Sequence, residues 1–170
     1  MLQSQIMMMR RVSKNHPLFF YILDKGVQYM IWFSIDEMVR SATAKRLGID
    51  NTPSDEIKNN LTLFIEKVLD PIRERYGSPL RISSGYRCKK LNDAVGGSKT
   101  SQHMKGEAAD LIPVDGDTRR LFYLIKEMID NKEIRCGQLI WEYGTKKAPK
   151  WVHISIETDK KHNQILYLGI

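Results

Sequence analysis

The stretch "SQHMKGEAAD", residues 101–110, sets one of the chain's four histidines among small and polar residues. Gly106 follows His103 by three positions and can turn the backbone, and Asp110 follows His103 by seven. His103 lies in a segment too polar for the core, whereas Asp110 lies in "AADLI", where an unpaired carboxylate is costly to bury. Asp110 therefore needs a partner, which a metal ion can supply.

A second histidine lies in a strand-like segment further along the chain. In "WVHISIE", residues 151–157, alternation places Val152 and Ile154 on one face and His153 on the opposite, polar face. The apolar set already occupies the core side, so His153 is free for another role, with a plain surface histidine as the alternative interpretation. Two imidazoles and one carboxylate make a catalytic zinc set that leaves the fourth position open.

Helical patterns precede this region. "SIDEMVRSATAKRLG", residues 34–48, has Ser34 and Glu37 at capping-box spacing and closes at Gly48, which predicts one helix of about three turns. A second helix is expected from about Ser54, with Pro71 kinking or restarting it. Its apolar stripe consists of Ile57, Leu61, Phe64, Ile65, Val68, Leu69 and Ile72.

Strand patterns dominate the second half of the chain. They are expected in "LRISSGYR" (80–87), "GEAADLIPV" (106–114), "QLIWEYG" (138–144), "WVHISIE" (151–157) and "ILYLG" (165–169). Helices are expected in "CKKLNDAVGG" (88–97) and "DTRRLFYLIKEMIDN" (117–131), the latter with Leu121, Leu124, Ile125 and Met128 inward. This order predicts an α+β fold, a single domain with N-terminal helices followed by a small antiparallel sheet that carries the zinc site.

Length and composition limit the classes of protein to which the chain can belong. A chain of 170 residues suits one domain that buries a core without metal or disulfide staples, and we expect it to be a monomer. No apolar run approaches the ~18 residues that span a bilayer, so no membrane span is expected. Cys88 and Cys136 form no CxxC pair, which leaves histidine and carboxylate as the available metal ligands.

The formal net charge of +7 suits a polyanionic partner such as nucleic acid, anionic lipid or the acidic polymers of a bacterial wall. The sign alone does not choose among them. The lysine clusters lack the interleaved aromatic residues of a single-strand binder, so we favour a solvated surface and expect no nucleic-acid partner.

Residues 1–30 carry weaker signals. Basic residues precede "PLFFYIL", but this apolar run is only seven residues long, and Asp24 and Lys25 follow where a cleavage site belongs. The stretch is a poor signal peptide. A short helix, or an extension upstream of a start near Met30, are equal alternatives.

Three separated segments resemble one family. "SQHMKGEAADL" followed by "WVHISI" resembles the zinc D-Ala-D-Ala carboxypeptidases and dipeptidases and related endolysin peptidases, whose pattern is SxHxxGxAxD and then a strand histidine. "SSGYRCKKLN" resembles the SGYR segment of the same family. The resemblance covers residues 82–156, and the helices from Ser34 fit the family's lead-in. It implies a zinc peptidase domain over residues 31–170, with residues 1–30 as an unassigned extension.

The resemblance also implies roles for single residues. His103, Asp110 and His153 would bind Zn²⁺, and Arg87 would engage the substrate near the scissile bond or at its terminal carboxylate. Ser101 would help to hold the substrate. A surface salt bridge is the alternative for Arg87, and a loop-capping hydroxyl is the alternative for Ser101.

The general base is less evident, because many relatives carry an acid three residues before the last histidine and this chain has Lys150 there. We predict Glu142, since "QLIWEYG" is expected beside "WVHISI" and alternation separates Glu142 from Leu139 and Trp141. Glu107 and Glu157 are the rival candidates, and a simple surface glutamate is the alternative.

The expected activity is zinc-dependent hydrolysis of a peptide bond next to a D-amino acid in a peptidoglycan stem peptide. Such a protein would come from a bacterium or a phage and act on the cell wall. A carboxypeptidase needs a cationic stop for the terminal carboxylate and an endopeptidase needs an open groove there, and Arg87 favours the first. A non-catalytic zinc-binding module is the alternative. His16 and His162 are expected to play no part in zinc binding.

Overall fold

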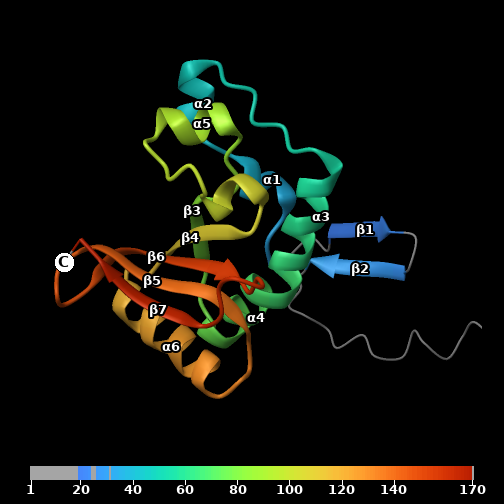
Figure 1. The fold of residues 1–170 in the computed structure, drawn as a ribbon. Helices are drawn as coiled ribbons and strands as arrows, with labels where there is room; N and C mark the ends of the chain where they lie inside the picture. Colours follow the sequence, from blue (N-terminus) through green and yellow to red (C-terminus); the bar gives the residue numbers. More distant parts are fainter. Residues whose placement is uncertain (1–18, 24–25, 31, 170) are drawn as a thin grey trace, which may run out of the picture.

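The computed structural model describes residues 19–23, 26–30 and 32–169, and Figure 1 shows helices arranged around a five-stranded sheet. The sheet consists of β3 (Leu80–Ser84), β4 (Ala108–Pro113), β5 (Cys136–Gly144), β6 (Pro149–Ile156) and β7 (Gln164–Leu168). The helices are α1 (Ile35–Val39), α2 (Ala42–Leu47), α3 (Asp55–Phe64), the π-helix η1 (Ile65–Leu69), α4 (Asp70–Tyr76), α5 (Lys89–Ala94), the 3₁₀-helix η2 (Gln102–Lys105) and α6 (Thr118–Asp130). The protein is therefore a single α+β domain, as the order of patterns predicted.

The strands follow the order β3-β4-β6-β5-β7, and the first four pair antiparallel as expected. The expectation is wrong for β7, which pairs parallel to β5. The topology explains this difference. β7 turns back after β6, but β4 and β5 already occupy both edges of β6. The free edge of β5 is left for β7, and there the returning chain runs in the same direction as β5.

The helix expected over residues 34–48 is two helices. Ser34 and Glu37 form the predicted capping box of α1, and Gly48 ends α2 in the left-handed conformation. Between them Arg40 is extended, with φ −67° and ψ 128°. The Ser41 side chain accepts the Ala44 N–H, which starts a new helix where the pattern suggested continuation.

The second predicted helix forms a continuous rod of α3, η1 and α4 that begins after the Ser54 cap. The predicted apolar stripe is fully buried except for Ile57, which is half-buried. Pro71 stands in the first turn of α4, and the turn before it widens to π geometry. Proline has no N–H for the preceding turn, which accounts for the change at this point.

One face of the sheet packs on α6 and forms the core. Leu139, Trp141, Val152 and Ile154 of β5 and β6 are buried there. From α6, the predicted inward residues Leu121, Ile125 and Met128 join them, and Leu124 packs partly buried at the edge. Asp110, Ile140 and His153 take the alternate positions on these strands, so they face the opposite side of the sheet.

The N-terminal segment forms β1 (Phe19–Leu23) and β2 (Gly26–Met30), which pair antiparallel. The short-helix alternative for "PLFFYIL" is therefore wrong over residues 19–23. Residues 17 and 18 of that run, and His16, lie outside the described residues. In the described part of the chain, no helix has the length and apolar character needed to cross a membrane.

Candidate metal centre

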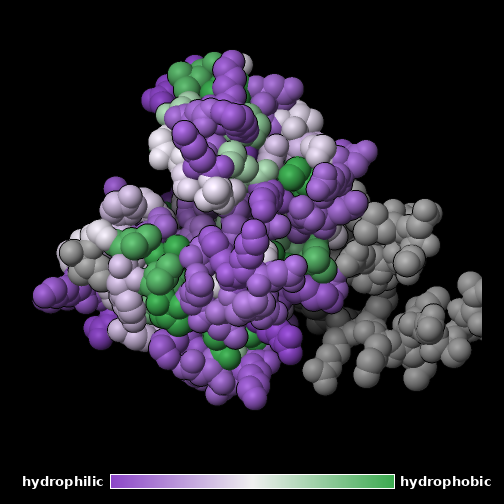
Figure 2. All heavy atoms as spheres, in the orientation of Figure 1, coloured by the Kyte–Doolittle hydropathy of each residue, from purple (hydrophilic) through white to green (hydrophobic). Residues whose placement is uncertain are grey.

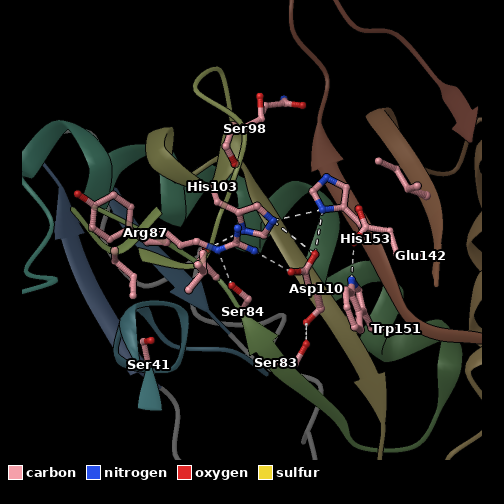
Figure 3. Close-up of a pocket in the computed structure, with 18 of the residues that line it drawn as sticks. Ser41, Ser83, Ser84, Arg87, Ser98, His103, Asp110, Glu142, Trp151 and His153 are labelled. Carbon is pink, nitrogen blue, oxygen red and sulfur yellow. Dashed lines mark hydrogen bonds and ion pairs between the residues drawn. The ribbon is translucent and has the colours of Figure 1, made fainter. Parts of the chain in front are cut away.

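Three side chains meet on the solvent side of the sheet. Asp110 of β4 and His153 of β6 are directly opposite each other in the antiparallel ladder, and His103 lies on η2 just before β4. The His153 Nδ1 atom is 2.9 Å from Asp110 Oδ1 and 3.3 Å from His103 Nε2. The ligand atoms all lie within 4.8 Å of one another. Figure 3 shows the three side chains pointing toward one another. The motif therefore brings together the residues that the sequence singled out.

Two glycines allow the backbone to approach closely around this cluster. Gly106 has φ +70° and ends η2, and a Cβ there would be 3.1 Å from the Ile57 carbonyl oxygen of α3. A Cβ on Gly85 would collide with the Met38 backbone. Both turns bring their segments against helices, and the Gly85 carbonyl is thereby placed beside His103.

The imidazole of His103 is oriented by that carbonyl. Its Nδ1 lies 2.8 Å from Gly85 O, so Nδ1 carries the proton and Nε2 faces the cluster with a free lone pair. Burial lowers the pKa of His103, although the hydrogen bond and charge of Asp110 act in the opposite direction. The ring is therefore neutral at neutral pH, as metal ligation requires.

Asp110 supplies the negative charge of the cluster. Burial alone would raise its pKa, but the close contacts with His103 and His153 outweigh burial and hold the pKa well below the usual range. All three residues are buried, with exposures of 4% for His103, 5% for Asp110 and 7% for His153. Two imidazoles and a carboxylate at this spacing can hold a metal ion.

Arg87 lies in the centre, but its partner there is Asp110. Its Nη2 donates to Asp110 Oδ2 at 3.0 Å, and its Nε donates to Ser84 Oγ at 2.8 Å. The side chain is 16% exposed, so this is a largely buried pair and the surface salt-bridge alternative does not describe it. Much of the charge of Arg87 is thus offset by the second oxygen of the candidate metal ligand.

Glu142 lies on the same face of β5. It is opposite Trp151, and Ile140 is opposite His153, so Glu142 is a diagonal neighbour of His153. The indole N–H of Trp151 donates to Glu142 Oε2 at 2.6 Å, a contact visible in Figure 3. This bond fixes one oxygen of the carboxylate beside the cluster.

The rival glutamates lie elsewhere. Glu157 is 3.0 Å from His162 and 3.8 Å from Arg135, and Glu107 has a buried Oε2 without a hydrogen-bond partner. Neither side chain lines the cleft around the cluster. His162 is an exposed residue that pairs with Glu157, away from His103 and His153.

The cluster opens into a cleft of about 950 Å³ between the helical part of the chain and the sheet. Figure 2 shows the surface hollowed between these parts, with mainly hydrophilic residues around the hollow. Ser101 lines the cleft, and its hydroxyl makes no cap hydrogen bond to η2. Glu142, Trp151 and Lys161 line it as well.

Trp151 and Lys161 were not among the predicted site residues. Alternation in "WVHISIE" places Trp151 on the face of His153, so this signal was available in the sequence. Lys161 follows β6 in a connecting segment, where no periodic pattern indicates the direction of a side chain.

The family model described as Peptidase M15 matches residues 31–155, which is well over half of the chain and includes every residue of the cluster. No curated protein matches the chain.

Proposed function

The chain belongs to the Peptidase M15 family, and we propose that it is a zinc peptidase that hydrolyses a bond next to a D-amino acid in peptidoglycan stem peptides. Membership implies a metallopeptidase. The observation that carries the proposal is the meeting of His103, Asp110 and His153 at the floor of a cleft that Glu142 also lines.

The three cluster residues would hold the zinc ion. Their donors are two ring nitrogens and a carboxylate oxygen, a set that fits a catalytic zinc with one open position. When bound, zinc supplies Lewis acidity, which activates water for attack and polarises the scissile carbonyl. The Gly85 carbonyl keeps His103 in the tautomer that this binding needs.

Glu142 is the proposed general base. Its carboxylate would take a proton from the attacking water and return that proton to the leaving amine. The Trp151 N–H occupies Oε2, so Oε1 is the oxygen left to exchange the proton. Trp151 thereby acts as a positioning residue.

Arg87 would stabilise the developing negative charge on the substrate. Ser84 and Asp110 engage two of its five N–H donors, which leaves the others for the scissile carbonyl oxygen. These bonds also hold the guanidinium in place, so little reorganisation is needed when charge develops. Ser101, on the wall of the same cleft, would hold the peptide.

The test is digestion of peptidoglycan fragments by the zinc-loaded protein, with products identified by mass spectrometry. Release of single D-alanines indicates a carboxypeptidase, and release of larger fragments indicates an endopeptidase. Chelation of the metal should abolish both. Full zinc occupancy without any hydrolysis would contradict the proposal and favour the non-catalytic metal-binding module.

A further inference from the structure

Lys161 is a cation in the cleft for which the proposed mechanism has no use. Its Nζ donates to Gln138 Oε1 at 2.7 Å and to Gln102 Oε1 at 3.2 Å. Both partners are neutral amides. Among the described residues, no carboxylate forms an ion pair with Lys161. Two amide oxygens thus hold the ammonium in one place, and no described carboxylate offsets its charge.

The two glutamines are themselves held in orientation. Gln102 donates its Nε2 to the Ile156 carbonyl at 3.4 Å, and Gln138 donates its Nε2 to Gln164 Oε1 at 2.9 Å. With each amide nitrogen engaged elsewhere, each amide oxygen faces Lys161. Gln102 is only 7% exposed, so its part of the support is built into the fold, whereas the bond between Gln138 and Gln164 lies at the surface.

The positions of Gln102 and Gln138 show where Lys161 lies with respect to the metal centre. Gln102 is the residue before His103 on η2. On β5, Gln138, Ile140 and Glu142 line the cleft, and Ile140 is opposite His153. Gln138 and Glu142 therefore lie on either side of His153, each about 7 Å along the strand from Ile140. Lys161 occupies the end of the centre away from the proposed general base.

Arg87 and Lys161, two of the cationic residues that line the cleft, differ in how far their charge is neutralised. Arg87 faces Asp110 at 3.0 Å, whereas Lys161 faces only amide dipoles. A substrate carboxylate should bind more favourably to Lys161 than to Arg87, because no protein carboxylate competes for the ammonium group. Extended peptide advances about 3.3–3.6 Å per residue, so a group two residues from the scissile bond lies about 7 Å from it, which matches the spacing of Gln138 and Ile140 along β5.

We propose that Lys161, held by Gln102 and Gln138, binds a carboxylate of the substrate and makes the protein selective for acidic peptides. The inference rests on the proposed function, and it transfers the role of carboxylate stop from Arg87 to Lys161. The carboxylate belongs to the terminal residue in a carboxypeptidase substrate, or to an acidic side chain in an endopeptidase substrate.

The experiment compares binding of matched ligands to the zinc-loaded protein by calorimetric titration. One pair is an N-acylated D-Ala-D-Ala and its C-terminal amide, and the other is a stem peptide with D-glutamate or D-glutamine beside the bond. Wild type should bind one acid about 10- to 100-fold more tightly than its amide, since a hydrogen bond to a charged group contributes about that factor. The pair that shows the preference identifies the source of the carboxylate.

Two variants remove the free charge in different ways. Lys161→Met deletes the cation, and Gln138→Glu places a carboxylate at the oxygen that Lys161 already contacts. Both should lose the preference for the acid, with amide binding changed less than about threefold. Lys160→Met is the matched control, because Lys160 is exposed, does not line the cleft and should keep the preference.

The outcomes separate this inference from the proposed function. If wild type prefers the acid and both variants lose that preference, Lys161 binds carboxylate even where no ligand is cleaved. If ligands are cleaved but Lys161→Met keeps the preference, the inference is overturned and the peptidase stands. A wild type that binds acid and amide equally also overturns it. Where cleavage occurs, Lys161→Met should raise KM for the acid, and Lys160→Met should not.

Discussion

The two ring nitrogens of His103 face different partners. Nδ1 bonds the Gly85 carbonyl, and Nε2 faces Asp110 and His153. The SGYR segment and the SxHxxGxAxD segment therefore meet in one hydrogen bond, because Gly85 belongs to the first and His103 to the second. Sequence alone suggested which residues belong to the centre. It did not show that Arg87 would pair with Asp110, because that contact depends on how the turn after β3 folds back over β4.

Replacing a cluster ligand should remove the metal. We expect wild type to hold one zinc per chain, and His103→Ala or Asp110→Ala to hold less than about a tenth of that under dialysis, because two protein ligands bind zinc far more weakly than three. Metal analysis of the purified variants measures this. His162→Ala is the control, since His162 pairs with Glu157 outside the cluster. If the His103→Ala variant kept full zinc occupancy, the proposed ligand set would be wrong.

Replacing Glu142 should separate catalysis from metal binding. Glu142→Gln is nearly isosteric and changes no cluster ligand, so fold and zinc content should persist while kcat falls by roughly two to four orders of magnitude. Glu107→Gln and Glu157→Gln should stay within about tenfold of wild type, because neither side chain lines the cleft. If one of these variants loses activity instead, the proton-transfer role belongs to that residue.

The sequence predicted the helices correctly where one clear pattern determined them. The stripe from Leu61 to Ile72 was recognisable by its period and is buried throughout. The break at Arg40 was not recognisable, because Ser41 is compatible with both a helix interior and a cap. The parallel placement of β7 depends on which strand edges are still free, a property of the assembled sheet that no local pattern contains.

The break between α1 and α2 predicts the effect of one substitution. Ser41→Ala removes the hydroxyl that caps α2 and should lower the free energy of unfolding by about 1 kcal/mol. Urea denaturation monitored by circular dichroism measures the change. Ser41→Asp is the matched control and should retain most of the stability, since aspartate caps equally well. An unchanged Ser41→Ala midpoint would mean that α2 does not need this cap.

At the scale of the whole molecule, the metal centre is an addition to a fold that has its own core. The buried set extends from Phe33 through α3, η1 and α6 to β6, and it includes none of the three cluster residues. Of the N-terminal extension, the described part forms the paired strands β1 and β2. The family match covers residues 31–155.

Removal of the metal should leave the protein folded but less stable. A ligand that binds only the folded state adds stability by mass action, so chelation should lower Tm by several degrees without loss of secondary structure. Calorimetry with and without chelator tests this. Unfolding on chelation at room temperature would show that the centre is structural.

Acid should weaken both the metal-free fold and metal binding. His103 and Asp110 both have lowered pKa values in the folded state, so each disfavours protonation there. Their contribution to stability is intact above the unfolded pKa values, about 6.5 for His and 3.9 for Asp, and is lost as pH falls through the lower folded values. Protons also compete with metal for the same atoms. Zinc release followed from pH 8 to 4 should therefore increase steadily towards acid.

The hydrogen bond between Trp151 and Glu142 has an optical consequence. Of the chain's three tryptophans, Trp141 packs in the core against Phe122 and Trp32 lies under Arg73, while Trp151 lines the cleft. Indole emission depends on the polarity and charge around the ring, so a peptide that enters the cleft or a proton that reaches Glu142 changes the spectrum of this one fluorophore. The molecule carries its own probe at the point where the chemistry is proposed to occur, and occupancy can be followed in real time without a label.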